Sequence, residues 1–128
     1  MNDVLLAVAI AATGVTRLEI DHVPNNISYR TALTPSEVDE RARIRVESRD
    51  PATVSAIVAA IEHTAASGDE RHADLRYAIR LRDARGSTRA LIYLDAVGEH
   101  GIVDGRRVRF SGDAIKRAIV AAFPSLRN

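Results

Sequence analysis

The chain has 128 residues, of which 46% are hydrophobic and 27% are charged, and its formal net charge is +1. This length suits one domain with one core, and the composition excludes a wholly disordered chain. Because the sequence contains no cysteine, disulfides, thiol nucleophiles and thiolate metal sites are excluded. We therefore predict a single domain over residues 1–128, with a core built from aliphatic residues and alanine.

The charge is divided unevenly along the chain. Residues 1–66 hold six arginines against nine acidic residues, a balance of −3, whereas residues 67–128 hold twelve basic residues against eight acidic ones, a balance of +4. Lys116 is the only lysine, so the other basic residues are all arginine. Such a division can steer a charged partner toward one end of the surface.

The chain opens on MNDVLLAVAIAATG, an apolar run shorter than the roughly 20 residues of a membrane span. A secretory signal peptide would begin with basic residues, but this run follows Asp3. Gly14 is typical of the position just after a helix. We predict a helix that buries Leu5, Val8 and Ala12, with a remnant of a signal peptide as the alternative.

Alternating polar and apolar residues predict strands over residues 15–23, 27–33 and 42–48. Between the second and third of these, Thr34-Pro35-Ser36-Glu37 fits a capping box and predicts a short helix that reaches Ala42. Asp50-Pro51 marks the start of a longer amphipathic helix, which we expect to end at Gly68.

The second half of the sequence has the pattern of a β-meander followed by a helix. Strands are predicted over residues 74–83, 88–95, 101–105 and 106–110, and the helix over residues 111–123. This order favours an α+β fold with an antiparallel or mixed twisted sheet of about five to seven strands and helices packed mainly on one face.

If helices cover one face of the sheet, the polar side chains of the strands share the other. This face can dock an acidic partner, because guanidinium groups form paired bonds with carboxylates. The alternative is a solvated face whose arginines pair with Glu19, Asp21, Glu47 and Asp83 across strands. With a pI near 8.3 and few aromatic residues, a nucleic-acid partner is not expected. The face comprises Arg43, Arg45, Glu47, Arg76, Arg80, Arg82 and Arg89, with Arg107 and Arg109 as further candidates.

A second candidate site lies in the glycine-rich stretch between two predicted strands. Asp95, Glu99, His100 and Asp104 fall within ten residues and could form an acid/base cluster on loops. The alternative is a pair of turns that need Gly and Asp for their backbone conformation. No histidine spacing fits a metal site, so we expect neither a metal nor a cofactor, and His22 is predicted to be a hydrogen-bonded core residue.

The stretch ALIYLDAVGEHGIVDGRRVRFSGDAIKRAI is similar to the carboxy-terminal part of small uncharacterised bacterial proteins. In size and class the whole chain resembles immunity proteins of bacterial contact-dependent growth-inhibition toxin/immunity pairs. Those proteins are small, cysteine-poor and non-enzymatic, and they neutralise a cognate toxin by binding it. The resemblance implies a protein that acts through its surface, and it assigns no site residue.

The expected function is therefore a non-enzymatic, toxin-neutralising binding domain, cytoplasmic and monomeric or weakly dimeric, with a protein toxin as partner and no membrane or nucleic acid. A basic toxin cleft would meet the acidic first half of the chain. Alternatives are a periplasmic or envelope-associated protein, and a small enzyme that uses the cluster from Asp95 to Asp104. The expected binding residues are Glu37, Asp39, Glu40, Glu47, Arg43, Arg45, Arg76, Arg80 and Arg82.

Overall fold

The computed structural model describes residues 14–68 and 72–128. The predicted helix containing Leu5, Val8 and Ala12 lies outside these residues. The elements in chain order are β1 (Val15–His22), α1 (Pro35–Arg41), β2 (Ile44–Ser48), α2 (Pro51–Thr64), β3 (Ala65–Ser67), β4 (Leu75–Asp83), β5 (Thr88–Asp95), β6 (His100–Val103), β7 (Arg106–Phe110), α3 (Ala114–Ala122) and a 3₁₀ turn (Pro124–Leu126).

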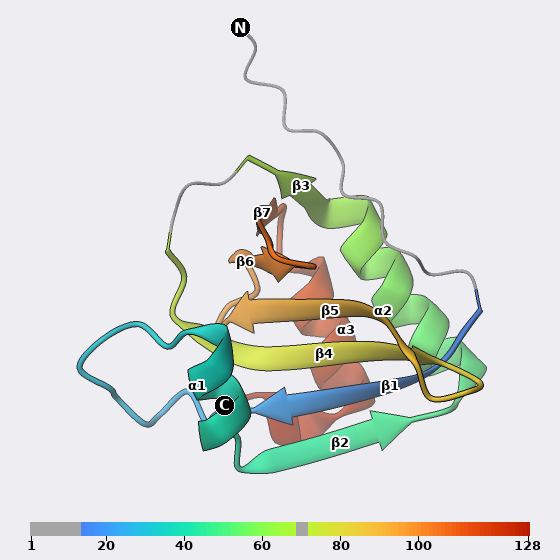
Figure 1. Cartoon of the computed structure of the whole chain (residues 1–128), viewed down its shortest axis with the longest axis horizontal. Coiled ribbons are helices and arrows are strands. Elements are labelled where there is room, and N and C mark those ends of the chain that lie inside the picture. The colour runs from blue at the N-terminus through green and yellow to red at the C-terminus, as the bar shows by residue number, and fades with distance from the viewer. Residues whose placement is uncertain (1–13, 69–71) are drawn as a thin grey trace, which may run out of the picture.

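The strands form one seven-stranded sheet in the order β2-β1-β4-β5-β6-β7-β3, and every pair of neighbours is antiparallel. The two longer helices, α2 and α3, lie together behind the sheet in Figure 1, while the short α1 lies in front of it. The predicted α+β class and antiparallel sheet are thus confirmed, with helices mainly on one face. β2 and β3 form the two edges.

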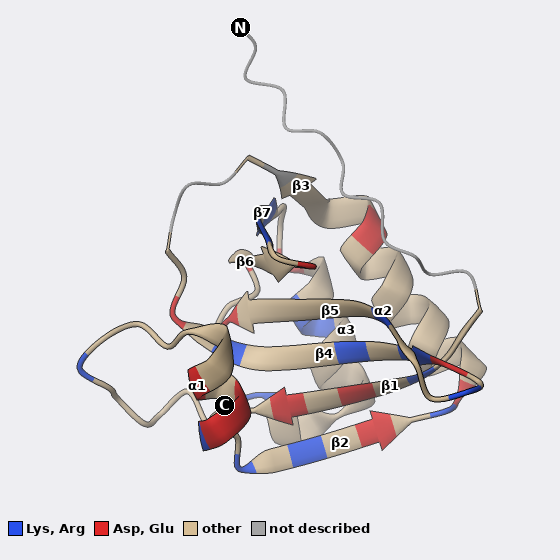
Figure 2. Ribbon diagram, viewed as in Figure 1, with Lys and Arg blue, Asp and Glu red and all other residues tan. Residues whose placement is uncertain are grey.

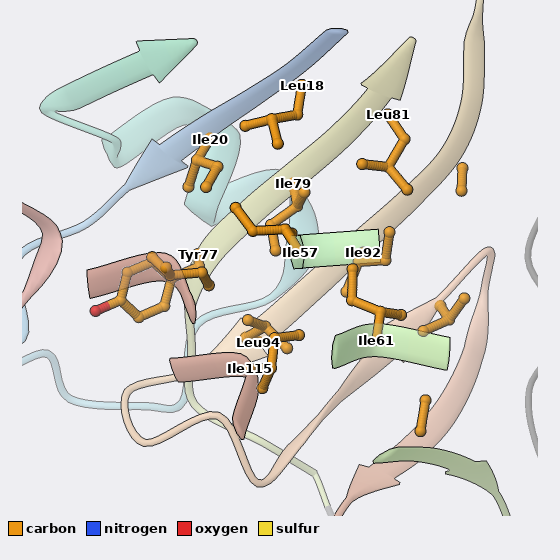
Figure 3. Packing of buried hydrophobic residues seen from close by; sticks show 14 of the residues in the cluster. Leu18, Ile20, Ile57, Ile61, Tyr77, Ile79, Leu81, Ile92, Leu94 and Ile115 are labelled. Atoms are coloured by element: carbon orange, nitrogen blue, oxygen red, sulfur yellow. The ribbon is translucent and has the colours of Figure 1, made fainter. Parts of the chain in front are cut away.

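The main core lies between the sheet and the two longer helices. Ile57 and Ile61 of α2 and Ile115 of α3 are almost completely buried against strand side chains such as Ile79 and Ile92 (Figure 3). Each fully buried aliphatic side chain contributes roughly 1.5 to 3 kcal/mol relative to exposure. The predicted apolar stripes of both helices therefore face the sheet.

A smaller core lies on the opposite face, under α1 and the loop over residues 23–34. It contains Val38 of α1 together with Leu33, Ala78 and Tyr93. A β-bulge between Leu75 and its neighbours on β4 turns that side chain toward this smaller core. Tyr77, Ile79 and Leu81 face the main core, so the alternation of the strand predicted over residues 74–83 is broken at Leu75.

The predicted strand over residues 27–33 is also wrong, because these residues form a loop. The loop is anchored by Arg76, whose Nη1 donates to the carbonyl oxygens of Pro24 at 2.8 Å and Ile27 at 2.7 Å. The amide of Leu33 donates to the Asp74 carboxylate at 2.9 Å. Side chains of β4 and its leading loop thus replace the strand-to-strand bonds that the alternation had suggested.

The starts of α1 and α2 follow the capping signals in the sequence. Thr34 caps α1 in a capping box with Glu37, and the Asp50 carboxylate caps α2 through the amide of Thr53. α2 ends at Thr64 rather than at Gly68, because the following residues form β3 and pair with β7. No helix within the described residues is long and apolar enough to cross a membrane.

Candidate functional site

A network of ion pairs joins β1, β2, β4 and α1. Figure 2 shows acidic and basic residues along these four elements. The centre of the network is Asp21 of β1, whose side chain is only 5% exposed. Arg45 of β2 donates to its two carboxylate oxygens through Nε at 2.6 Å and Nη2 at 3.1 Å, and Arg80 of β4 donates from the other side at 3.0 Å. One buried carboxylate therefore ties three adjacent strands together.

The same network fixes α1 to the sheet. The second terminal nitrogen of Arg80 donates to Asp39 of α1 at 2.8 Å, and the hydroxyl of Tyr93 on β5 donates to the other oxygen of Asp39 at 3.0 Å. Burial and the hydrogen bond to Asp39 raise the pKa of Tyr93 to about 12. Burial lowers the pKa of Arg80, but its carboxylate partners outweigh this effect and the net shift is upward.

A second group of charges lies further along β1 and β4. Glu19 of β1 accepts from Arg82 of β4 at 3.2 Å and lies 3.5 Å from Arg17 of its own strand. The predicted alternative of arginines paired across strands is therefore confirmed for Glu19 and Asp21. It is wrong for Asp83, whose carboxylate accepts backbone amides in the β4–β5 turn.

Arg76 differs from the other arginines of this set. We expected it on the exposed face, but it is only 5% exposed, and its guanidinium is committed to loop carbonyls and to Asp74 at 3.1 Å. The aromatic ring of Tyr29 also lies 5.3 Å from its guanidinium carbon. Arg76 thus holds the loop that supports α1 and presents little surface to a partner.

The remaining predicted residues divide between two surfaces. Glu37 and Glu40 lie on α1, where Glu37 completes the capping box and Glu40 is exposed. Arg43 and Glu47 are exposed at the β2 edge of the sheet, on either side of Arg45. The structure therefore brings together Asp39, Arg45 and Arg80 through Asp21.

The loop cluster of Asp95, Glu99, His100 and Asp104 is not assembled. Asp104 lies in the β6–β7 turn, at the opposite end of β6 from the other three. Its carboxylate accepts the amide of Leu91 at 2.9 Å, and its φ of +48° belongs to the tight turn with Gly105. The four side chains do not meet, because β6 separates Asp104 from the other three, and the predicted alternative of turns built on Gly and Asp describes Asp95 and Asp104.

The acidic groups at the other end of β6 are also used by the backbone. Asp95 accepts the amides of Gly98 at 2.8 Å and Glu99 at 2.9 Å, so its carboxylate closes a turn. Asp95 and His100 line a shallow surface hollow with His72. Among residues 14–68 and 72–128, no three His, Asp or Glu side chains are grouped as metal ligands.

His22 is buried and hydrogen-bonded, as predicted. Its Nδ1 lies 3.1 Å from the carbonyl oxygen of Arg76, and its ring stacks on Tyr77 at 4.2 Å between centroids. Burial lowers its pKa below 6.5, although the carbonyl groups of Arg76 and Asn128 oppose the shift. The Tyr77 hydroxyl donates to Leu126 and accepts from Lys116 at 2.8 Å, which holds the C-terminal segment against the core.

Two members of the network were missed as site residues. Asp21 was predicted only as a partner of arginines on a solvated face. Its burial follows from the position of α1, which the alternation of polar and apolar residues in the strands does not reveal. Tyr93 was assigned to a strand without a role, and its alternation with Ile92 and Leu94 was the available signal that it faces α1.

These features define an α+β domain with an antiparallel sheet and a charged network beneath a short helix. Comparisons with protein-family models, curated proteins and solved structures give no match to this chain.

Proposed function

We propose that this chain is a non-enzymatic protein-binding domain, and most concretely an immunity protein that neutralises a cognate bacterial toxin by direct binding. The observation that carries the proposal is the attachment of α1 to the sheet through Asp39. Because Arg80 and Tyr93 both bind that carboxylate, the helix is held in one position. A preformed surface loses less conformational entropy on binding than a flexible one.

The outer surface of α1 supplies the recognition chemistry in this proposal. All three acidic side chains of α1 are accessible: Glu40 is exposed, Asp39 is 40% exposed although it bonds Arg80 and Tyr93, and Glu37 is 30% exposed. The only basic residue of the helix is Arg41, whose Nε lies 4.0 Å from Glu37 and whose guanidinium carbon lies 5.0 Å from the Tyr29 ring. The acidic side of α1 suits a basic cleft on a toxin, such as the cleft of a nuclease.

An interface of this class buries roughly 1,200 to 2,000 Å² in total, and complementary charge accelerates encounter. Glu40 would contribute mainly to that electrostatic attraction, because its side chain has no ion-pair partner among the described residues. Arg80 and Tyr93 would act by holding the helix through Asp39, whose side chain is 40% exposed.

Co-expression tests this function. The chain is produced together with each protein encoded by the genes that flank its own, and growth is measured after induction of that protein, which this proposal expects to be a toxin. We expect the wild-type chain to relieve growth arrest and Glu40→Arg to relieve it less. Glu62→Arg is the matched control, because Glu62 is also exposed but lies on α2, behind the sheet. Persistent arrest with the folded wild-type chain, or equal effects of the two variants, would contradict the proposal.

A further inference from the structure

The β2 edge of the sheet carries an open row of backbone groups. The amide of Val23, the residue after β1, donates to the carbonyl oxygen of Arg76 on β4. Because backbone groups alternate in direction along a strand, those of His22 and of every second residue before it face β2. Their register partners on β2 are Ile44, Val46 and Ser48. Arg45 and Glu47 therefore direct their N–H and C=O groups away from the sheet.

The side chains on this edge contain an unbalanced charge. Glu47 lies directly opposite Glu19 in the β1–β2 register, and like charges in that position are destabilising. Glu19 already has Arg17 and Arg82 beside it, but Glu47 has no ion-pair partner among the described residues. Arg45 binds the two carboxylate oxygens of Asp21 through Nε and Nη2, so its Nη1 bonds neither of them. The Arg45 side chain is 66% exposed.

We infer that β2 is a self-association edge, and that a second copy of this chain pairs with it in antiparallel orientation about Val46. In this arrangement Arg45 of each copy faces Glu47 of the other, and the two Val46 residues meet on the two-fold axis. The outward backbone groups of Arg45 and Glu47 then bond across the interface, and the two sheets become continuous.

The charge pattern selects this register over its neighbours. Shifting the pairing by two residues in one direction places Arg45 opposite Arg45, and shifting it in the other places Glu47 opposite Glu47. Only pairing about Val46 joins opposite charges at both positions. A longer ladder would bring Arg43 opposite Arg49, so the complementary segment is confined to the centre of the strand.

The apolar side of the strand is consistent with the same partner. Ile44 and Val46 pack on the main core but remain partly exposed at the edge. Pairing about Val46 brings the two valines together and places Ile44 opposite Ser48 of the other copy. Charged side chains commonly protect edge strands from pairing with other chains. Here the charges of Arg45 and Glu47 are complementary to those of the same two residues in a second copy.

Sedimentation equilibrium of the full chain tests the inference. We expect a reversible dimer at concentrations up to about 100 μM, and Glu47→Arg should raise the dissociation constant about tenfold or more because two arginines then oppose each other at both ends. Glu62→Arg makes the same charge change on α2, away from the edge, and should leave the dissociation constant unchanged. A monomeric wild-type chain, or equal effects of the two variants, would overturn the inference.

Mixing two variants separates a charge effect from a loss of folding. Glu47→Arg carries two basic residues on the edge, and Arg45→Glu carries two acidic ones, so each should dimerise poorly alone while their mixture forms a heterodimer. Circular dichroism confirms that each is folded. If Arg45→Glu does not fold beside Asp21, Glu47→Pro replaces it, because it removes an outward N–H and should also dissociate the dimer. No heterodimer from folded variants, or an unaffected Glu47→Pro dimer, would refute the pairing.

Discussion

Replacing Asp21 by asparagine tests whether one buried carboxylate holds the network together. The substitution keeps the side-chain shape but removes the charge that Arg45 and Arg80 share. Arg45 is 66% exposed and can turn to water, so its loss is small, on the scale of about 0 to 1 kcal/mol for exposed pairs. Arg80 is only 18% exposed and keeps Asp39 as its second partner. A charged hydrogen bond contributes about 1.5 to 3 kcal/mol.

The expected loss for Asp21→Asn is therefore about 2 kcal/mol of the free energy of unfolding, measured by urea denaturation followed by circular dichroism. Asp113→Asn is the matched control. Asp113 lies 3.0 Å from Arg117, but both side chains are more than two-thirds exposed, at 68% and 74%. That substitution should change stability by less than about 0.5 kcal/mol. Equal losses for the two variants would refute a structural role for the buried network.

Further predictions concern the core, a close contact and two titrations. Ile79→Ala should cost about 3 kcal/mol of stability in the same urea assay, because the side chain is completely buried. Gly101→Ala should cost at least about 2 kcal/mol, since its Cβ would overlap the carbonyl oxygen of Tyr93. In an absorbance titration, Tyr93 should ionise only near pH 12, and Tyr93→Phe should remove that step. Because burial lowers the pKa of His22, the unfolded chain binds the proton first, so stability should decrease as pH falls below 6.5; His22→Asn should weaken this decrease.

Local sequence patterns predicted most elements because they report which side of a strand or helix is apolar. The strands from β4 to β7, the capping box of α1 and the apolar stripe of α3 all follow from residues close together in the chain. β3 was missed because Ala65, Ala66 and Ser67 resemble the end of a helix. Its pairing with β7 is a long-range contact that local spacing does not encode.

The errors around Arg76 have one physical origin. An alternating pattern predicts that an arginine between apolar residues lies on the surface. A guanidinium group has five N–H donors, however, and can bond several loop carbonyl oxygens at once. Here those bonds fix a loop where a strand was expected, and that loop supports α1. Asp39 and Arg80 are 41 positions apart in the chain, so local sequence patterns do not show that their side chains meet.

The most direct test of the proposed function is isothermal titration calorimetry of the purified chain against the purified product of the flanking gene that arrests growth when expressed alone. We predict saturable binding with one copy of this chain per toxin domain. Glu40→Arg should bind more weakly than wild type, and Glu62→Arg should bind with unchanged affinity. Absence of binding by the folded wild-type chain, or an affinity insensitive to Glu40→Arg, would contradict recognition through α1.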